Sequence, residues 1–208
     1  MKKRLFVTGL TGFVRQHIQA RLLADASGWE LLPVPSRYDL GEPDSLECLW
    51  PQVPDAVIQL AGQTFVPEAF RDPARTLNIN VLGTLNLLQA LKARGFVGTF
   101  LYVSSGDVYG QVSEDHLPIT ELQPPYPRNP YAVSKLSAEF LSLQWGLSEG
   151  WSVLVARPFK PHRSAASIAW KTRGDRPGDH RSAERQIPGR GRYRPLRRSI
   201  RPDGLNAA

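Results

Sequence analysis

Short apolar runs alternate with longer stretches of helical periodicity over the first three quarters of the chain. The apolar runs predict strands at about residues 4–9, 29–34, 55–62, 98–103 and 152–156. The stretches between them predict helices at about residues 12–25, 67–94 and 129–147, with a further helix start at 43–46. Strands that alternate with helices imply right-handed crossovers and parallel pairing. We therefore expect a doubly wound parallel α/β sheet with helices on both faces.

Candidate core positions within these helices follow the helical period. They are Phe13, Ile18, Leu22, Leu23, Leu46, Leu49, Leu77, Val81, Leu85 and Leu88. A loop with five prolines, from Pro118 to Pro130, leads into the last helix.

The first apolar run ends in a glycine turn, and a helical pattern follows it. Gly9 allows the tight turn, and Gly12 lets the backbone approach a pyrophosphate at the positive end of the following helix. This strand–turn–helix phosphate loop predicts a dinucleotide site in a Rossmann-type fold. A third glycine is expected at position 15, where the sequence has Arg15. A long cation there must either push the helix away from the strand or point toward the pyrophosphate.

The regular pattern stops at Lys160. Residues 160–208 contain thirteen Lys and Arg against four Asp and Glu, no Val or Phe, and only five Leu or Ile. Such a segment cannot bury enough apolar surface to offset the entropy of ordering it, so we expect a disordered basic tail. The sequence thus predicts two parts: an NAD(P)-binding domain at 1–159 with an incomplete sheet, and the tail at 160–208.

Composition excludes several classes of protein. The net charge of +7 comes from the tail, because residues 1–159 carry 13 Lys and Arg against 15 Asp and Glu. No apolar run reaches eighteen residues, and the run after the basic Met1–Arg4 is too short for a signal peptide, so we expect a cytoplasmic protein without a membrane span. The single cysteine, Cys48, cannot form an internal disulfide. The four histidines have no metal-ligand spacing, which predicts no metal site: His17, His116, His162 and His180.

Three polar residues could carry chemistry together. Tyr131 and Lys135 are four residues apart, so a helix places them on one face. A neighbouring ammonium favours the phenolate, which brings a tyrosine into range as an acid–base group. Ser105 follows the fourth predicted strand, where its hydroxyl could bond a substrate carbonyl. A polarising hydroxyl, a proton donor and a tuning cation are the parts that hydride delivery to a ketone requires.

The chain resembles the extended short-chain dehydrogenases/reductases of the nucleotide-sugar epimerase/dehydratase group. The matching motifs occur in the family's order at residues 8–14, 39–40, 54–62, 80–84, 104–110, 131–135 and 156–159. Within the family, residues 61–67 and 103–110 are most similar to members that reduce the 4-keto group of GDP-4-keto-6-deoxy-D-mannose to give GDP-D-rhamnose.

The resemblance implies a role for each matching residue. Ser105 would bind the 4-keto oxygen, Tyr131 would donate the proton, and Lys135 would hold the nicotinamide ribose and lower the pKa of the tyrosine. Asp107 stands where the dehydratases have a glutamate, and it would orient the substrate unless it is merely a turn residue. The resemblance further implies that Asp39 and Leu40 meet the adenine of the cofactor. The other residues implied to contact the cofactor are Gly9, Thr11, Gly12, Phe13, Val14, Leu60, Ala61, Gly62, Tyr131, Lys135 and Pro158.

The cofactor would be NADP or NAD. Arg37 lies just past the second predicted strand, where an arginine suits a 2′-phosphate and favours NADPH, although it could equally be a solvated loop charge. Gln59 replaces the histidine that the family usually has before Leu-Ala, and we expect little effect from that change.

The implied partners are a GDP-sugar substrate and a second copy of the chain, since family members often pair through the helices at about 67–94 and 129–147. Two other functions stay open. One is a GDP-mannose 4,6-dehydratase, and the other is a non-catalytic nucleotide- or nucleic-acid-binding protein that uses the basic tail. Despite the basic tail, we do not expect nucleic acid as a partner.

The family continues beyond Phe159 with Asn-His, an apolar residue, Gly-Pro and a C-terminal substrate lobe. Here the chain reads Lys160-Pro161-His162-Arg163. If these codons are AAA CCA CAT CGG, deletion of one A gives AAC CAC ATC GG, which encodes Asn-His-Ile-Gly. Our hypothesis is that the tail is an out-of-frame translation that replaces the lobe, and that it leaves the enzyme impaired. A natural basic tail is the alternative.

Overall fold

The computed structural model describes residues 2–9, 12–24, 28–34, 38–46 and 52–159, without the side chains of Phe13, Leu23 and Ala24. Its strands are β1 (Lys3–Val7), β2 (Trp29–Leu31), β3 (Ala56–Gln59), β4 (Thr99–Val103) and β5 (Ser152–Ala156). Its α-helices are α1 (Phe13–Ala24), α2 (Val66–Arg71), α3 (Pro73–Leu77), α4 (Gly83–Ala93) and α5 (Pro130–Glu149). Contacts divide the chain into units at Met1–His162 and Arg163–Ala208, and the second unit, with the expected tail, lies outside the described residues.

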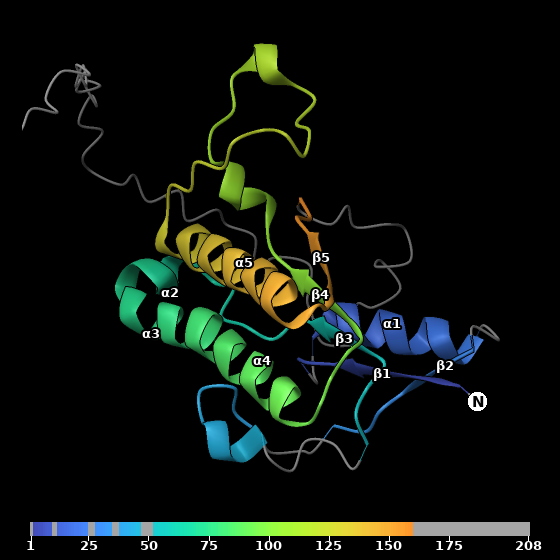
Figure 1. Ribbon diagram of the computed structural model, residues 1–208. Helices are drawn as coiled ribbons and strands as arrows, with labels where there is room; N and C mark the ends of the chain where they lie inside the picture. Colours follow the sequence, from blue (N-terminus) through green and yellow to red (C-terminus); the bar gives the residue numbers. More distant parts are fainter. Residues whose placement is uncertain (1, 10–11, 25–27, 35–37, 47–51, 160–208) are drawn as a thin grey trace, which may run out of the picture. The chain divides into compact units, whose positions relative to one another are not determined.

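The five strands form one parallel sheet in the order β2-β1-β3-β4-β5. The order reverses beside β1, because the chain steps outward from β1 to β2 and then returns to β3 on the other side (Figure 1). At such a switch point, the carboxyl ends of the strands leave a crevice in which ligands bind. The Rossmann-type α/β class predicted from the sequence is confirmed.

Each face of the sheet has its own apolar core, and the helices divide between the faces (Figure 1). On one face, Phe6, Val57 and Phe100 pack with residues of α4 and α5 such as Leu88 and Ala138. On the other face, Ile18 and Leu22 of α1 pack against a smaller cluster of strand residues: Leu5, Val7 and Ala56. Helices on both faces allow strands that are apolar throughout, as in doubly wound sheets.

Burial decreases across the α1 face of the sheet. One side-chain row runs through paired residues of four strands, from Val7 to Ile58, Leu101 and Leu154. Val7 is fully buried, the two middle residues are half-buried, and Leu154 is 54% exposed. No described helix covers β5 on this face, and no described strand pairs with its outer edge.

The long helix expected at 67–94 is interrupted. The segment contains α2, then α3, which begins at Pro73 after Asp72, then a π-helical turn η2 (Asn78–Leu82), and finally α4. Pro73 has no N–H to donate, so the helix restarts with Asp72 as its cap, whose carboxylate accepts from the Arg75 amide at 2.9 Å. The predicted core position Leu77 is wrong, since that side chain is 39% exposed.

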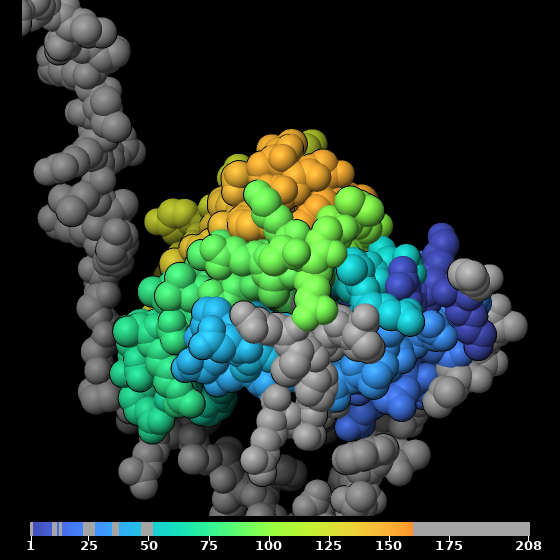
Figure 2. All heavy atoms as spheres, turned by 60° about the horizontal axis from the view of Figure 1, so that its bottom comes forward, coloured from blue at the N-terminus to red at the C-terminus, as the bar shows by residue number. Residues whose placement is uncertain are grey.

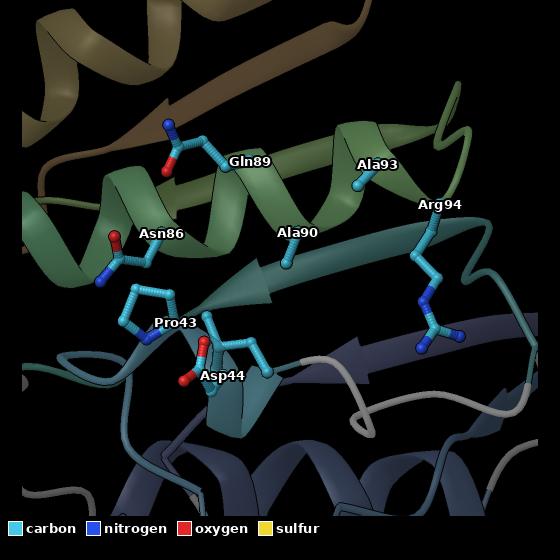
Figure 3. Close-up of a pocket in the computed structure, with 8 residues that line it drawn as sticks. Pro43, Asp44, Asn86, Gln89, Ala90, Ala93 and Arg94 are labelled. Carbon is cyan, nitrogen blue, oxygen red and sulfur yellow. The ribbon is translucent and has the colours of Figure 1, made fainter.

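The remaining predicted elements are close to the observed ones, although β2 ends at Leu31 and the start at 43–46 is a short 3-10 helix, η1. Figure 2 shows the light-blue atoms of η1 against the green helical layer that contains α4. A groove of about 470 Å³ runs between η1 and α4 (Figure 3). None of the predicted site residues lines this groove.

Among the described residues, no helix is both long and apolar enough to cross a bilayer. No cluster of candidate metal ligands occurs in the same part of the chain.

Candidate active site

The glycine turn at the end of β1 is fixed by the residue before it. The Thr8 hydroxyl donates to Gln59 Oε1 at 2.8 Å and accepts from the amides of Leu60 and Ala61 at 2.9 and 2.8 Å. Gly9 then adopts a φ of +77°, with space for a Cβ only at contact distance from the Ala61 amide. One buried hydroxyl thus joins the ends of β1 and β3. Gln59 is an acceptor in this network, so the change from histidine keeps a polar partner for Thr8.

Gly12 leaves the start of α1 open. Its amide donates to the Gly9 carbonyl at 3.1 Å, and a Cβ placed on it would meet no other described atom within 4 Å. Val14, on the first turn of α1, is 47% exposed. The first amides of a helix lack partners within it and attract anions. Gly12 therefore leaves room for a pyrophosphate beside the positively polarised start of α1.

Arg15 folds inward instead of extending over the turn. The residue is 9% exposed, and its Nε donates to the Val7 carbonyl at 3.4 Å. Its charge also acts on Tyr38, whose hydroxyl accepts from the Gly9 amide at 3.2 Å. Burial raises the pKa of Tyr38, whereas the Gly9 bond and the Arg15 charge oppose that rise. The side chain thus points to the end of β1 and not over the turn, while a displacement of α1 from the strand stays a prediction.

Asn80 joins the turn after β3 to α5. Its Oδ1 accepts from the Gln63 amide at 2.8 Å, while its Nδ2 donates to the Gln63 carbonyl at 3.0 Å and to Ser134 Oγ at 2.8 Å. The residue is 2% exposed and lies in the π-helical turn η2. A Cβ on Gly62 would approach Asn80 Oδ1 to 2.8 Å, so this close packing requires glycine there.

Ser105, Asp107 and Tyr131 come together at the carboxyl end of β4. Ser105 caps the short helix η3 (Gly106–Tyr109), accepting from the Asp107 amide at 3.2 Å. Tyr131 lies on the first turn of α5, where Asn129 caps the helix by accepting from the Ala132 amide at 2.7 Å. Burial raises the pKa of Tyr131, a hydrogen bond with Ser105 lowers it, and the Asp107 carboxylate raises it. Ser105, rather than Lys135, is the group that favours the phenolate in this structure.

Lys135 lies one turn further along α5, on the face that it shares with Tyr131. It is 5% exposed, and its Nζ is 4.5 Å from the centroid of the Tyr102 ring on β4. Burial lowers the pKa of Lys135 to about 8, and Glu139 opposes that shift. The ammonium therefore lies in an aromatic, water-poor environment that favours its neutral form.

Two buried hydroxyls next to this cluster have no hydrogen-bond partner among the described residues: Tyr102 Oη and Ser104 Oγ. Burial strongly raises the pKa of Tyr102, and Tyr131 and Glu139 add to that rise. Tyr102 thus stays a neutral phenol beneath the ammonium of Lys135.

The predicted cofactor residues fall into three groups. Gly9, Gly12, Ala61 and Gly62 line the turns where β1 and β3 end. Leu40 is 6% exposed and packs in the main core, and Asp39 Oδ1 accepts from the Gly41 amide at 2.8 Å, so a contact of either with an adenine stays a prediction. Thr11 and Arg37 lie outside the described residues, as does the side chain of Phe13.

Pro158 extends from β5 toward the serine turn, and its carbonyl accepts from the Gly106 amide at 2.8 Å. Several residues of this region were missed as site residues. They are Thr8, Tyr38, Asn80, Tyr102, Glu139 and Arg157. The sequence offers a signal for two of them, since Thr8 directly follows an apolar strand and Asn80 interrupts an apolar helical pattern.

A model of the NAD dependent epimerase/dehydratase family matches residues 5–162. Over 159 residues, the chain is 76% identical to GDP-6-deoxy-D-mannose reductase of Pseudomonas aeruginosa, which covers 76% of this chain and 52% of that protein. It is 31% identical over 178 residues to GDP-mannose 4,6-dehydratase of Vibrio cholerae, a match that covers 72% of this chain and 47% of the relative.

Solved structures of nucleotide-sugar enzymes also resemble this chain. RMD from Pseudomonas aeruginosa, complexed with NADPH, superposes with a TM-score of 0.74 at 75% identity, covering 76% of this chain and 55% of that one. UDP-glucose 4-epimerase of Thermus thermophilus, in complex with NAD, matches with a TM-score of 0.65 at 30% identity, covering 79% and 60%.

The chain spans about half the length of these relatives. The matched half contains the parallel sheet, the glycine turn and the cluster of Ser105, Tyr131 and Lys135. The chain belongs to the NAD-dependent epimerase/dehydratase family.

Proposed function

We propose that residues 1–159 form the cofactor-binding half of an NADPH-dependent reductase that converts GDP-4-keto-6-deoxy-D-mannose to GDP-D-rhamnose. The observation that carries this proposal is the 76% identity over 159 residues to the GDP-6-deoxy-D-mannose reductase of Pseudomonas aeruginosa. The NADPH in the similar solved structure supports the choice of cofactor. The dehydratase is less favoured, because the corresponding identity is 31%.

The described residues fit a dinucleotide. Gly9 and Gly12 present backbone without a side chain at the positive end of α1, which suits a pyrophosphate. The turn at Ala61 and Gly62 lies beside it, joined to it by Thr8. Lys135 would hold the hydroxyls of the nicotinamide ribose, and Arg37 would meet a 2′-phosphate. When bound, NADPH would supply the hydride.

The remaining chemistry would belong to side chains of this chain. Ser105 would donate a hydrogen bond to the 4-keto oxygen and hold it next to Tyr131. Tyr131 would then donate its phenolic proton to that oxygen as charge develops on it, the task of a general acid. The raised pKa of Tyr131 keeps this proton on the phenol until it is needed. Asp107 would orient the sugar.

The relatives are about twice as long as the matched part of this chain, and their second half bears on substrate binding. We propose that the sugar nucleotide binds between this half and a second lobe, so the chain alone would bind NADPH but turn over its substrate poorly. Residues 160–208 would contribute no lobe, in line with the out-of-frame hypothesis.

A chimera tests the proposal directly. Residues 1–159 are joined to the second half of the Pseudomonas aeruginosa reductase, and NADPH consumption is followed with GDP-4-keto-6-deoxy-D-mannose. We expect turnover by the chimera, and a loss of at least about 100-fold in its Tyr131→Phe variant. Tyr126→Phe, which removes the same hydroxyl from a side chain that is 68% exposed, is the matched control. A chimera that tightly retains NADP+ and converts GDP-mannose to its 4-keto-6-deoxy product, with the hydride returned within the same turnover, would instead establish the dehydratase.

We also propose that the protein pairs through α2, α3 and α5. Exposed apolar side chains are concentrated on these helices and on η2: Phe65, Phe70, Leu77, Leu82, Val133, Phe140, Leu143 and Leu147. A patch of this kind on a soluble domain marks an interface. Sedimentation should show a dimer that Phe140→Glu dissociates, whereas Leu154→Glu on β5 should not affect it.

A further inference from the structure

A buried ion pair lies one helical turn beyond Lys135. Glu139, on α5, is 1% exposed. Arg157, just past β5, donates from Nε to Glu139 Oε2 at 3.0 Å and from Nη2 to Oε1. Two parallel hydrogen bonds hold the planar groups in one geometry. Neither residue has been assigned a role in binding the substrate or the cofactor above.

Both members of the pair connect to the reacting cluster. Glu139 follows Lys135 by four residues and shares its face of α5. The Arg157 guanidinium is 4.9 Å from the centroid of the Tyr109 ring, which belongs to η3 directly after Ser105. One ion pair therefore links the helix that carries Tyr131 and Lys135 to the turn that carries Ser105.

The charge balance around Lys135 is incomplete. The Glu139 carboxylate interacts with two cations, Lys135 and Arg157. Both of its oxygens accept hydrogen bonds from Arg157. Two titratable side chains act on Lys135 directly, Tyr102 on β4 through its ring and Glu139 on α5 through its charge. Their own neighbours come from three elements: Arg157 after β5 binds Glu139, Tyr131 on α5 acts on Tyr102, and Asp107 on η3 acts on Tyr131.

We propose that Glu139 and Arg157 are positioning residues that act as a pair to set the charge of Lys135. Glu139 supplies the negative charge that keeps the buried ammonium protonated. Arg157 occupies that carboxylate, so it weakens the hold on Lys135 and leaves the ammonium free for a ligand. The consequence for catalysis rests on the proposed function, whereas the effect on the charge of Lys135 does not.

In this arrangement, a small change in nearby charge can change the protonation state of Lys135 near neutral pH. Burial lowers its pKa to about 8, with Glu139 opposing the shift. Without Glu139, Lys135 would lose the carboxylate that opposes the effect of burial, so its pKa would fall further. Without Arg157, an uncompensated carboxylate would remain and raise it. The two substitutions break the same bond, yet they should move Lys135 in opposite directions.

The experiment measures Lys135 itself in the cofactor-free protein. The sequence has six lysines, so ¹³Cε-labelled lysine gives a simple spectrum, and Lys135→Met assigns the signal. We expect the wild-type signal to titrate near pH 8. Arg157→Gln should raise this midpoint and Glu139→Gln should lower it, each by about one unit or more. The double variant should lie between them.

A pair that only stabilises the fold would lower the urea midpoint in both variants and leave Lys135 titrating alike. That result overturns the proposal, as does a wild-type Lys135 that titrates with exposed lysines near ~10.4. If Glu139→Gln does not fold, the wild-type value and Arg157→Gln still decide. Because the measurement needs neither NADPH nor sugar nucleotide, a failed chimera assay leaves it intact.

Discussion

The Lys135 ammonium lies 4.5 Å from the centroid of the Tyr102 ring, whose hydroxyl has no partner among the described residues. The ring contributes packing and a cation–π contact, while the hydroxyl contributes a desolvation cost. Tyr102→Phe should therefore change the free energy of unfolding by less than about 1 kcal/mol, or raise it. Tyr102→Leu should lower it by roughly 2–4 kcal/mol. Urea unfolding measures both, and an equal loss in the two variants would show that the hydroxyl is bonded.

Arg15 should weaken NADPH binding. It occupies the position at which glycine allows α1 to pack closely on β1, and its buried guanidinium has no carboxylate partner among the described residues. We expect Arg15→Gly to bind NADPH about 10-fold more tightly, equivalent to about 1.4 kcal/mol. Fluorescence titration of the cofactor measures the affinity. Equal affinities would show that Arg15 is harmless, and Arg21→Gly, on the exposed face of α1, controls for helix loss.

Acid should weaken the link between β1 and the segment before β3. Arg4 Nε donates to Asp55 Oδ2 at 3.0 Å, and this bond lowers the pKa of Asp55 to about 2. Because the unfolded pKa is about 3.9, the stabilisation is present above pH ~4 and is lost as the pH falls toward ~2. The two side chains are 30% and 40% exposed, so we expect less than about 1 kcal/mol. Asp55→Asn should flatten the stability curve in this window, while the exposed Asp44→Asn should not.

Asn80 should be costly to replace. Its side chain makes three hydrogen bonds, one buried to Ser134 and two part-buried to Gln63, so Asn80→Ala leaves polar groups of the turn after β3 and of α5 without these partners. We expect a loss of roughly 2–3 kcal/mol in the free energy of unfolding. Asn86→Ala is a matched control, because Asn86 is half-buried and its side chain donates a hydrogen bond to the Leu40 carbonyl at 2.7 Å. Equal losses in the two variants would contradict the role given to Asn80.

The codon for residue 160 tests the out-of-frame hypothesis. Resequencing should find an adjacent frame that reads Asn-His-Ile-Gly-Pro. Removal of the extra base should then extend the likeness to the reductase beyond residue 159 and restore turnover. A verified adjacent frame without that reading would end the hypothesis.

The sequence allowed the fold to be predicted where local pattern determines structure. Strand β5 was predicted at its observed bounds, and the glycine turn, Tyr131 and Lys135 lie where their motifs placed them. The interruption at Asp72–Pro73 could have been read from the proline, but the apolar period across it masked that signal.

Contacts between distant segments could not be predicted in this way. Tyr102, Glu139 and Arg157 look like ordinary strand and helix residues in the sequence. Their importance comes from burial side by side, which depends on how α5 lies across β4 and β5. The inward position of Arg15 likewise depends on the carbonyl at the end of β1, which no spacing rule reveals.

The double use of the Thr8 hydroxyl has a consequence for motion. This one oxygen accepts from the amides of Leu60 and Ala61. The turn after β1 and the turn after β3 therefore cannot separate without leaving both N–H groups unbonded. Any adjustment to a ligand must then come from the segments after β4. These are the turn at Ser105 and the proline-rich loop before α5, which have fewer buried hydrogen bonds. Hydrogen exchange should be slow at the Leu60 and Ala61 amides and faster across the loop at residues 117–128.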